Sequence, residues 1–100
     1  MKTVGYWYSK DFPTLPMPLG APRPWKGEEE FLAALQVVET ICRTDHYKGS
    51  STCRICGCSN GSGECRTDQF RWPTGLRHYV EKHHIGLPED FVKYVLAKAK

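Results

Sequence analysis

The sequence predicts a small α+β fold, and three observations lead to that class. Residues 27–43 and 88–99 place apolar side chains at helical spacing. Residues 64–66 and 70–72 have the composition of two short strands that could form a hairpin or meander. A cysteine pair and a later group of histidines have the spacing of metal ligands. We expect one domain over residues 1–100, because a chain of 100 residues is the size of a single core.

The first 26 residues are expected to form an extended arm. They contain five of the seven prolines, and proline fixes φ and removes a backbone donor, which opposes a helix or a central strand. The aromatic residues of the arm are Tyr6, Trp7, Tyr8, Phe12 and Trp25. Because disordered linkers rarely carry so many large rings, we expect the arm to lie across the globule with these rings partly buried. A proline-rich ligand for an aromatic groove is the functional alternative.

Two helices are expected outside the metal-ligand pattern. Residues 27–43 begin with three glutamates, which favour the positive end of a helix dipole, and continue with an apolar face. Residues 88–99 begin with proline and two acids and have lysines towards the end. Cys42 on the first helix is interpreted as a small buried hydrophobe. Residues 45–51 lack periodicity and are rich in turn formers, so we expect a loop there.

A Cys-x2-Cys motif supplies the first two predicted metal ligands, Cys53 and Cys56. Gly57 follows the pair and permits a turn that lets both thiolates converge on one ion, as in a zinc knuckle. The cysteine count is odd, at five, which counts against a framework built only from disulfides and favours metal binding in a reducing compartment. The sequence therefore predicts one structural Zn²⁺ and a cytoplasmic location.

The remaining ligands are expected on a helix that begins near Pro73 and stops near Gly86. His78 is the third predicted ligand. His83 is five positions further along and about 140° round the helix, whereas His84 is about 240° round, so His83 is preferred as the fourth. With a structural zinc ion in a small core, we expect residues 51–86 to be largely unfolded when the metal is absent.

Other uses of the cysteines stay open. Cys58 and Cys65 could join Cys53 and Cys56 in a site of four thiolates, although Cys58 would crowd Cys56 at the ion. A disulfide between Cys58 and Cys65 and two unused thiols are further alternatives. Redox chemistry is disfavoured, because the residues after the cysteine pair oppose the helix whose N-terminus lowers a thiol pKa in redox motifs.

Residues 51–86 resemble a Cys2His2 zinc finger of the ββα type or a related treble-clef-like module. Phe70 and Leu76 have the five-residue gap of a finger core, but 21 residues separate the cysteine pair from the first histidine, where fingers have about 12. The resemblance implies a structural zinc ion without the standard mode of reading DNA. Residues 72–79 also look like a pattern in small uncharacterised bacterial or phage proteins, which implies no activity.

Charge gives a mild indication of an anionic partner. The net charge is +3, and all of this excess lies in residues 54–100, which have eight Lys or Arg against five Asp or Glu. Nucleic-acid binding would use five basic residues: Arg54, Arg66, Arg71, Arg77 and Lys82. Because the excess is small, we expect a protein partner that binds the aromatic arm, with DNA or RNA as the alternative.

Catalysis and membrane insertion are not expected. Four protein ligands would close the zinc site, and a catalytic zinc needs an open position with a nearby base. If only three residues bound the ion, Glu64 or Glu81 could be that base, but both read more simply as surface carboxylates. The sequence has no apolar stretch of about 20 residues, the length of a membrane span.

Overall fold

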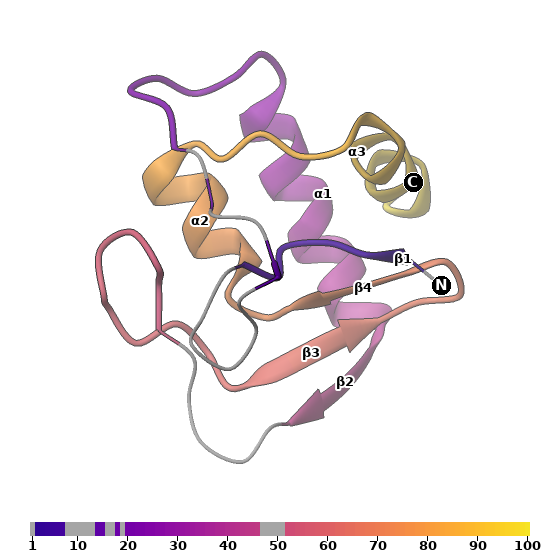
Figure 1. Cartoon of the computed structure of the whole chain (residues 1–100). Coiled ribbons are helices and arrows are strands. Elements are labelled where there is room, and N and C mark those ends of the chain that lie inside the picture. The colour runs from indigo at the N-terminus through magenta and orange to yellow at the C-terminus, as the bar shows by residue number, and fades with distance from the viewer. Residues whose placement is uncertain (1, 8–13, 16–17, 19, 47–51) are drawn as a thin grey trace.

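The computed structural model describes residues 2–7, 14–15, 18, 20–46 and 52–100 (Figure 1). In these residues the chain forms three helices and one four-stranded sheet, so the predicted α+β class is confirmed. Several expectations fall outside the described residues, namely those for Tyr8, Phe12 and residues 47–51.

The three helices lie close to where the sequence placed them. Helix α1 spans Glu28–Ile41, α2 spans Leu76–His83 and α3 spans Glu89–Lys98. Helix α2 ends three residues before Gly86, because His84 takes the left-handed conformation with φ of 53°. The His84 N–H bonds to the carbonyl of Val80, and the Ile85 N–H bonds to that of Tyr79. These bonds terminate the helix immediately after His83.

The sheet has the order β1-β4-β3-β2. Strands β3 (Gly63–Arg66) and β4 (Phe70–Pro73) are antiparallel and form the predicted hairpin. The sequence did not predict β1 (Lys2–Thr3), which pairs parallel to β4, or β2 (Arg43–His46), which pairs antiparallel to β3. The expectation of a loop from residue 45 was therefore wrong for residues 45 and 46, because pairing with β3 outweighs local turn composition.

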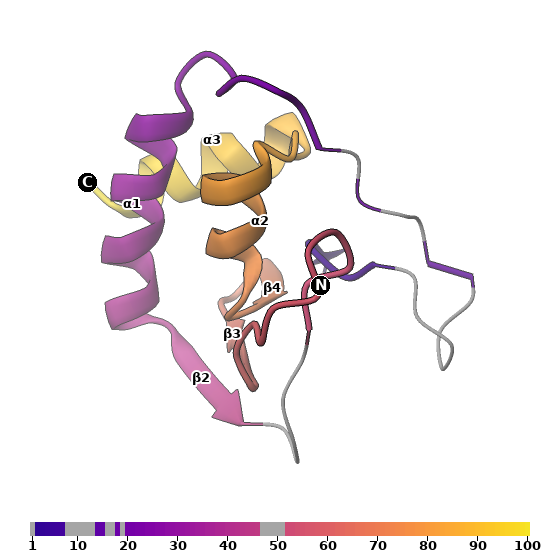
Figure 2. The same cartoon turned by 90° about the vertical axis from the view of Figure 1, so that its left-hand side faces the viewer.

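The helices cover one side of the sheet, as Figures 1 and 2 show. Phe91 of α3 lies at the centre of the resulting core and has no exposed surface. Its ring centroid is 5.9 Å from that of Phe31, 5.2 Å from Phe70 and 5.3 Å from Trp72. Along β3 and β4, buried side chains such as Cys65 and Trp72 alternate with half-buried ones such as Arg66 and Arg71. The sheet therefore has one face in the core and one face directed away from the helices.

A carboxyl group lies at the edge of this core. Glu39 of α1 accepts hydrogen bonds from Trp72 Nε1 at 3.1 Å and from Cys65 Sγ at 3.7 Å. Burial raises the pKa of Glu39, and the Trp72 hydrogen bond and the charge of Arg77 oppose that rise only in part. No local pattern predicts this buried carboxyl group, because its partners Trp72 and Cys65 come from strands far away in the chain.

The raised pKa of Glu39 predicts a pH-dependent cost to folding. Stability from the neutral carboxyl is fully present below the ordinary pKa of 4.5 and is lost as pH rises through the higher pKa of the folded protein. We expect Glu39→Gln, which keeps an acceptor for Trp72, to gain stability over the wild type as pH rises from about 4.5 to 8. Urea unfolding across this range measures the difference, with Glu30→Gln on the exposed side of α1 as control. If the difference in unfolding free energy between Glu39→Gln and the wild type did not change with pH, the raised pKa of Glu39 would be contradicted.

Candidate metal centre

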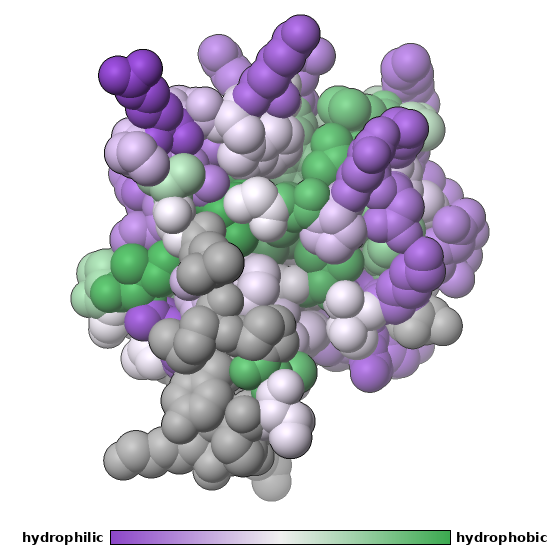
Figure 3. All heavy atoms as spheres, turned by 45° about the horizontal axis from the view of Figure 1, so that its top comes forward, coloured by the Kyte–Doolittle hydropathy of each residue, from purple (hydrophilic) through white to green (hydrophobic). Residues whose placement is uncertain are grey.

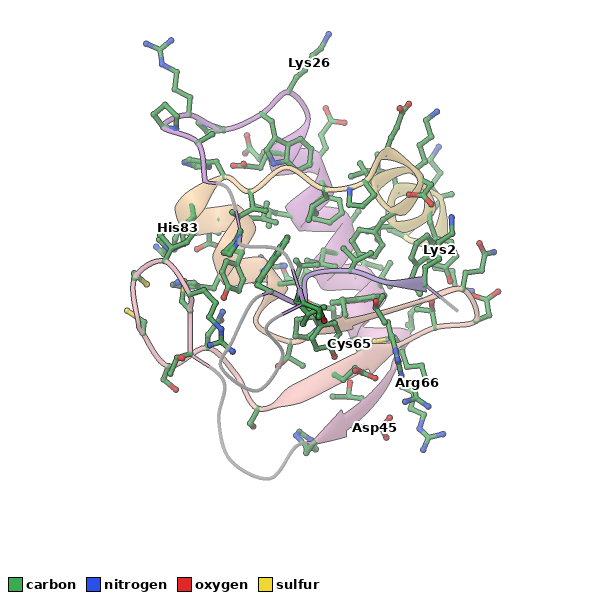
Figure 4. The ribbon with its side chains drawn as sticks, in the orientation of Figure 1. Lys2, Lys26, Asp45, Cys65, Arg66 and His83 are labelled. Atoms are coloured by element: carbon green, nitrogen blue, oxygen red, sulfur yellow. The ribbon has the colours of Figure 1, made fainter. Side chains whose placement is uncertain are left out.

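Four side chains that the sequence singled out lie together beside α2. One ligand atom from each of Cys53, Cys56, His78 and His83 lies within 4.8 Å of all the others. The thiols come from the loop between β2 and β3, and the imidazoles come from α2. Figure 4 shows His83 at the end of α2, beside this loop. Because two thiols and two imidazoles converge, the group could hold a metal ion.

The loop that carries the cysteines is closed by its own backbone. Thr52 and Ser59 form an antiparallel bridge, and the Cys53 N–H donates to the carbonyl of Cys58 at 2.8 Å. Gly57 has φ of 76°, a conformation that favours glycine, and its N–H donates to the carbonyl of Cys53 at 2.9 Å. The Ile55 N–H donates to Cys53 Sγ at 3.4 Å.

The two histidines complete the group from the helix. His78 Nε2 lies 3.3 Å from Cys56 Sγ, and the ring centroids of His78 and His83 are 5.2 Å apart. Burial, with a further contribution from the charge of His83, lowers the pKa of His78, which keeps its imidazole neutral and able to bind a metal. His83 Nε2 is buried and has no hydrogen-bond partner. A buried ring nitrogen without a partner is costly, and a metal ion would satisfy it.

His84, the rival fourth ligand, points elsewhere. The turn that ends α2 directs its ring to Glu28 at the start of α1, where Nδ1 lies 2.9 Å from one carboxylate oxygen and 3.1 Å from the other. The Glu28 residue is 5% exposed, so His84 supplies a partner to a buried acid. From the sequence, Glu28 was expected only to favour the helix dipole. The contact between Glu28 and His84 therefore gives the adjacent histidines different roles: His84 pairs with a buried acid, and His83 lies in the metal-ligand group.

The N-terminal arm contacts the same end of α2. The Ala21 N–H donates to the carbonyl of His83 at 2.9 Å, and Trp25 Nε1 donates to the carbonyl of Ile85 at 3.0 Å. A Cβ atom at Gly20 would lie 3.0 Å from the His83 carbonyl oxygen, so the arm approaches the helix closely there. Trp7 packs edge-on against Tyr79, with ring centroids 5.8 Å apart. The partial burial expected for the arm is therefore observed at Trp7 and Trp25.

A small apolar cluster surrounds the buried cysteine. Cys53, Tyr79 and Ile85 form its centre, and Trp7 and Leu87 pack against them. The Tyr79 hydroxyl accepts a hydrogen bond from the Arg54 N–H at 2.8 Å, and burial raises the pKa of Tyr79. This cluster shields one side of the metal-ligand group from solvent, whereas Cys56 on the other side is exposed.

The other cysteines do not join the group. Cys58 is exposed, whereas Cys65 is buried in the main core, where burial raises its pKa and its thiol contacts Glu39. Neither residue belongs to the set of converging ligand atoms found in the described part of the chain. All five cysteines are free thiols, so the alternative disulfide between Cys58 and Cys65 is not formed. The geometry therefore favours the mixed set over four thiolates.

The five basic residues expected to bind nucleic acid come from different elements: the cysteine loop, β3, β4 and α2. Arg77 donates to the carbonyl of Leu32 at 2.9 Å and, like Lys82, lies near Glu81 of its own helix. Arg54 Nη1 donates to the carbonyl of Thr52 within the cysteine loop. Arg66 and Arg71 are cross-strand partners in β3 and β4. These last two residues are therefore neighbours on the sheet.

Comparisons with known proteins provide no assignment. The chain matches no protein family, no curated protein and no solved structure. No helix in the described residues is long and apolar enough to cross a membrane. The function must therefore be inferred from the geometry of the chain itself.

The separate roles of the adjacent histidines can be tested by substitution. We expect His84→Asn to leave the metal content unchanged and to lower the free energy of unfolding by about 1 to 3 kcal/mol, because Glu28 loses its partner while asparagine tolerates the left-handed backbone. His83→Asn is expected to lose the metal. Elemental mass spectrometry and urea unfolding on both variants measure these effects. Loss of metal from His84→Asn with retention in His83→Asn would reverse the assignment.

Proposed function

We propose that this protein is a non-catalytic zinc-binding protein in which one structural Zn²⁺ stabilises the fold and which binds a macromolecular partner. The observation that carries the proposal is the convergence of Cys53, Cys56, His78 and His83 within 4.8 Å. In this proposal residues 52–59 act as a zinc knuckle and α2 as the ligand-bearing helix. The arrangement is similar to a Cys2His2 finger with an enlarged interval between its two halves.

The distances support a tetrahedral ion. Zinc lies about 2.3 Å from sulfur and 2.0 to 2.1 Å from nitrogen, so neighbouring ligand atoms in a tetrahedron are about 3.3 to 3.8 Å apart. Cys56 Sγ and His78 Nε2 are already 3.3 Å apart, and small side-chain adjustments suffice for pairs nearer the 4.8 Å limit. Two thiolates with two imidazoles in this geometry favour Zn²⁺ over harder ions such as Mg²⁺ or Ca²⁺.

The surroundings of the ligands favour a structural role over a catalytic one. Four protein ligands leave no open position for water or substrate. The two carboxylates considered as bases are engaged elsewhere, since Glu64 accepts a hydrogen bond from Tyr6 and pairs with Arg66, and Glu81 pairs with Arg77. The ion would join the cysteine loop to α2, whose carbonyls also hold the N-terminal arm at Ala21.

The position of the N-terminal arm weakens the expectation of a protein partner. The expected protein-binding surface consisted of aromatic rings, yet Trp7 packs on Tyr79 and Trp25 packs on Phe31 within the molecule. On the face seen in Figure 3, green apolar atoms lie in small areas between purple hydrophilic side chains. The exposed large apolar side chains in the described part of the chain are Val37 and Ile41 of α1 and Ile55 of the cysteine loop, and they lie on two separate elements. The arm therefore gives little support to a protein partner.

Metal content tests the proposal directly. We expect one zinc per chain in the protein purified without added metal, and loss of that zinc in Cys53→Ser and His78→Asn, because three remaining ligands hold the ion much more weakly. Cys58→Ser is the matched control, since it removes a nearby exposed thiol and should keep the zinc. Elemental mass spectrometry gives both the identity of the metal and its stoichiometry.

Two results would contradict the proposal. Absence of any metal from a folded protein would show that the four side chains converge without binding an ion. Zinc that is lost from Cys58→Ser but kept in His78→Asn would require a site built from thiolates.

A further inference from the structure

We propose that the face of the sheet turned away from the helices binds the phosphate backbone of single-stranded nucleic acid through a row of three arginines. The proposal deepens the binding role suggested above by naming the partner and the surface. It rests on that proposed function only for the role of binding a macromolecule. The surface itself does not depend on the zinc site, because none of the three arginines is a metal ligand.

Strand register creates the row. Arg43 of β2 is paired with Arg66 of β3, and Arg66 is paired with Arg71 of β4. Residues directly opposite each other in a sheet point to the same face. The neighbours Cys65 and Trp72 are buried in the core, so the arginines occupy the opposite face. With strands about 4.8 Å apart, three guanidinium groups are presented over a width of about 10 Å.

Like charges directly opposite each other destabilise a sheet, so this row needs compensation. Asp45 pairs with Arg43 at 3.2 Å and lies 3.9 Å from Arg66, and Glu64 lies 3.4 Å from Arg66. In Figure 4, Arg66 and Asp45 lie at the lower edge of the sheet, away from the helices. Among the described residues, two carboxylates therefore serve three guanidinium groups, which leaves one positive charge uncompensated in this row.

Two of the arginines have unused donors. The Nε atoms of Arg66 and Arg71 are buried without a hydrogen-bond partner, and Arg71 forms no ion pair among the described residues. A guanidinium presents five N–H donors in a planar fork that matches phosphate oxygens, so a phosphate at the half-buried Arg71 would bond its terminal N–H groups, while the buried Nε is closed to solvent. Arg71 is therefore the residue on which binding should depend most.

The chemistry of this face favours nucleic acid over an acidic protein. Protein interfaces are built round a buried apolar centre, whereas the rows across these strands consist mainly of charged residues. A repeated positive charge on a flat surface suits the repeated phosphates of a flexible strand. Tyr6, whose hydroxyl bonds to Glu64, brings an aromatic ring to this face on which a base could stack.

Fluorescence anisotropy with a labelled single strand of about 12 nucleotides and mixed sequence tests the proposal. We expect binding by the purified protein at about 50 mM salt, with a slope of log affinity against log salt of about −2 for three phosphate contacts. Arg71→Gln should weaken binding about three- to tenfold and reduce the slope to about −1.4. Lys26→Gln is the matched control, because it removes the same charge from an exposed position at the opposite end of the molecule (Figure 4) and should change little.

The possible results distinguish a failure of the nucleic-acid proposal from a failure of the zinc-site proposal. Metal content and far-UV circular dichroism of each variant are measured on the same samples, so a misfolded or metal-free protein is recognised as such. Absence of binding by zinc-loaded, folded protein would overturn the nucleic-acid proposal and leave the zinc site standing. Equal weakening by Lys26→Gln would reduce the effect to net charge, and tighter binding of polyglutamate than of DNA or RNA would replace nucleic acid with an acidic protein.

Discussion

Two thiols from a loop and two imidazoles from α2 converge on one possible metal position. The placement of the cysteine loop, α2 and the N-terminal arm depends on this convergence. The loop holds Cys53 and Cys56 through its own backbone bonds, and α2 holds His78 in its first turn and His83 as its last residue. The carbonyl of His83 then accepts a hydrogen bond from the N-terminal arm. Because none of residues 52–59 belongs to the main core, a bound ion would supply much of what fixes the cysteine loop in place.

The molecule therefore has two centres of stability. The larger is the apolar core round Phe91, which joins α1, α3 and the central strands. The smaller is the cluster of Cys53, Tyr79 and Ile85 beside the metal-ligand group. Leu76 and Val80 of α2 belong to the larger core, so this helix connects the two. The arginine row lies on the sheet, on the side of the larger centre, so metal binding and the proposed nucleic-acid surface can be varied separately.

Local patterns in the sequence predicted much of this arrangement, and long-range pairing accounts for what they missed. Helix spacing, acidic first turns and the Cys-x2-Cys motif located the three helices and the four converging side chains. Strand β2 was missed because residues 43–46 have no strand pattern of their own and depend on pairing with β3. The contacts of Glu39 with Trp72 and of Glu28 with His84 join residues 33 and 56 positions apart, so no local sequence pattern predicts them.

Hydrogen–deuterium exchange, compared between the zinc-loaded protein and the same protein after chelation, tests the central claim most directly. We expect amides in the cysteine loop and at the end of α2, such as those of Cys53, Gly57 and His84, to lose protection without zinc. Amides inside α1 should keep most of theirs, because the core round Phe91 does not include the ligands. Equal protection of the loop with and without zinc would contradict the claim that the ion holds these segments together.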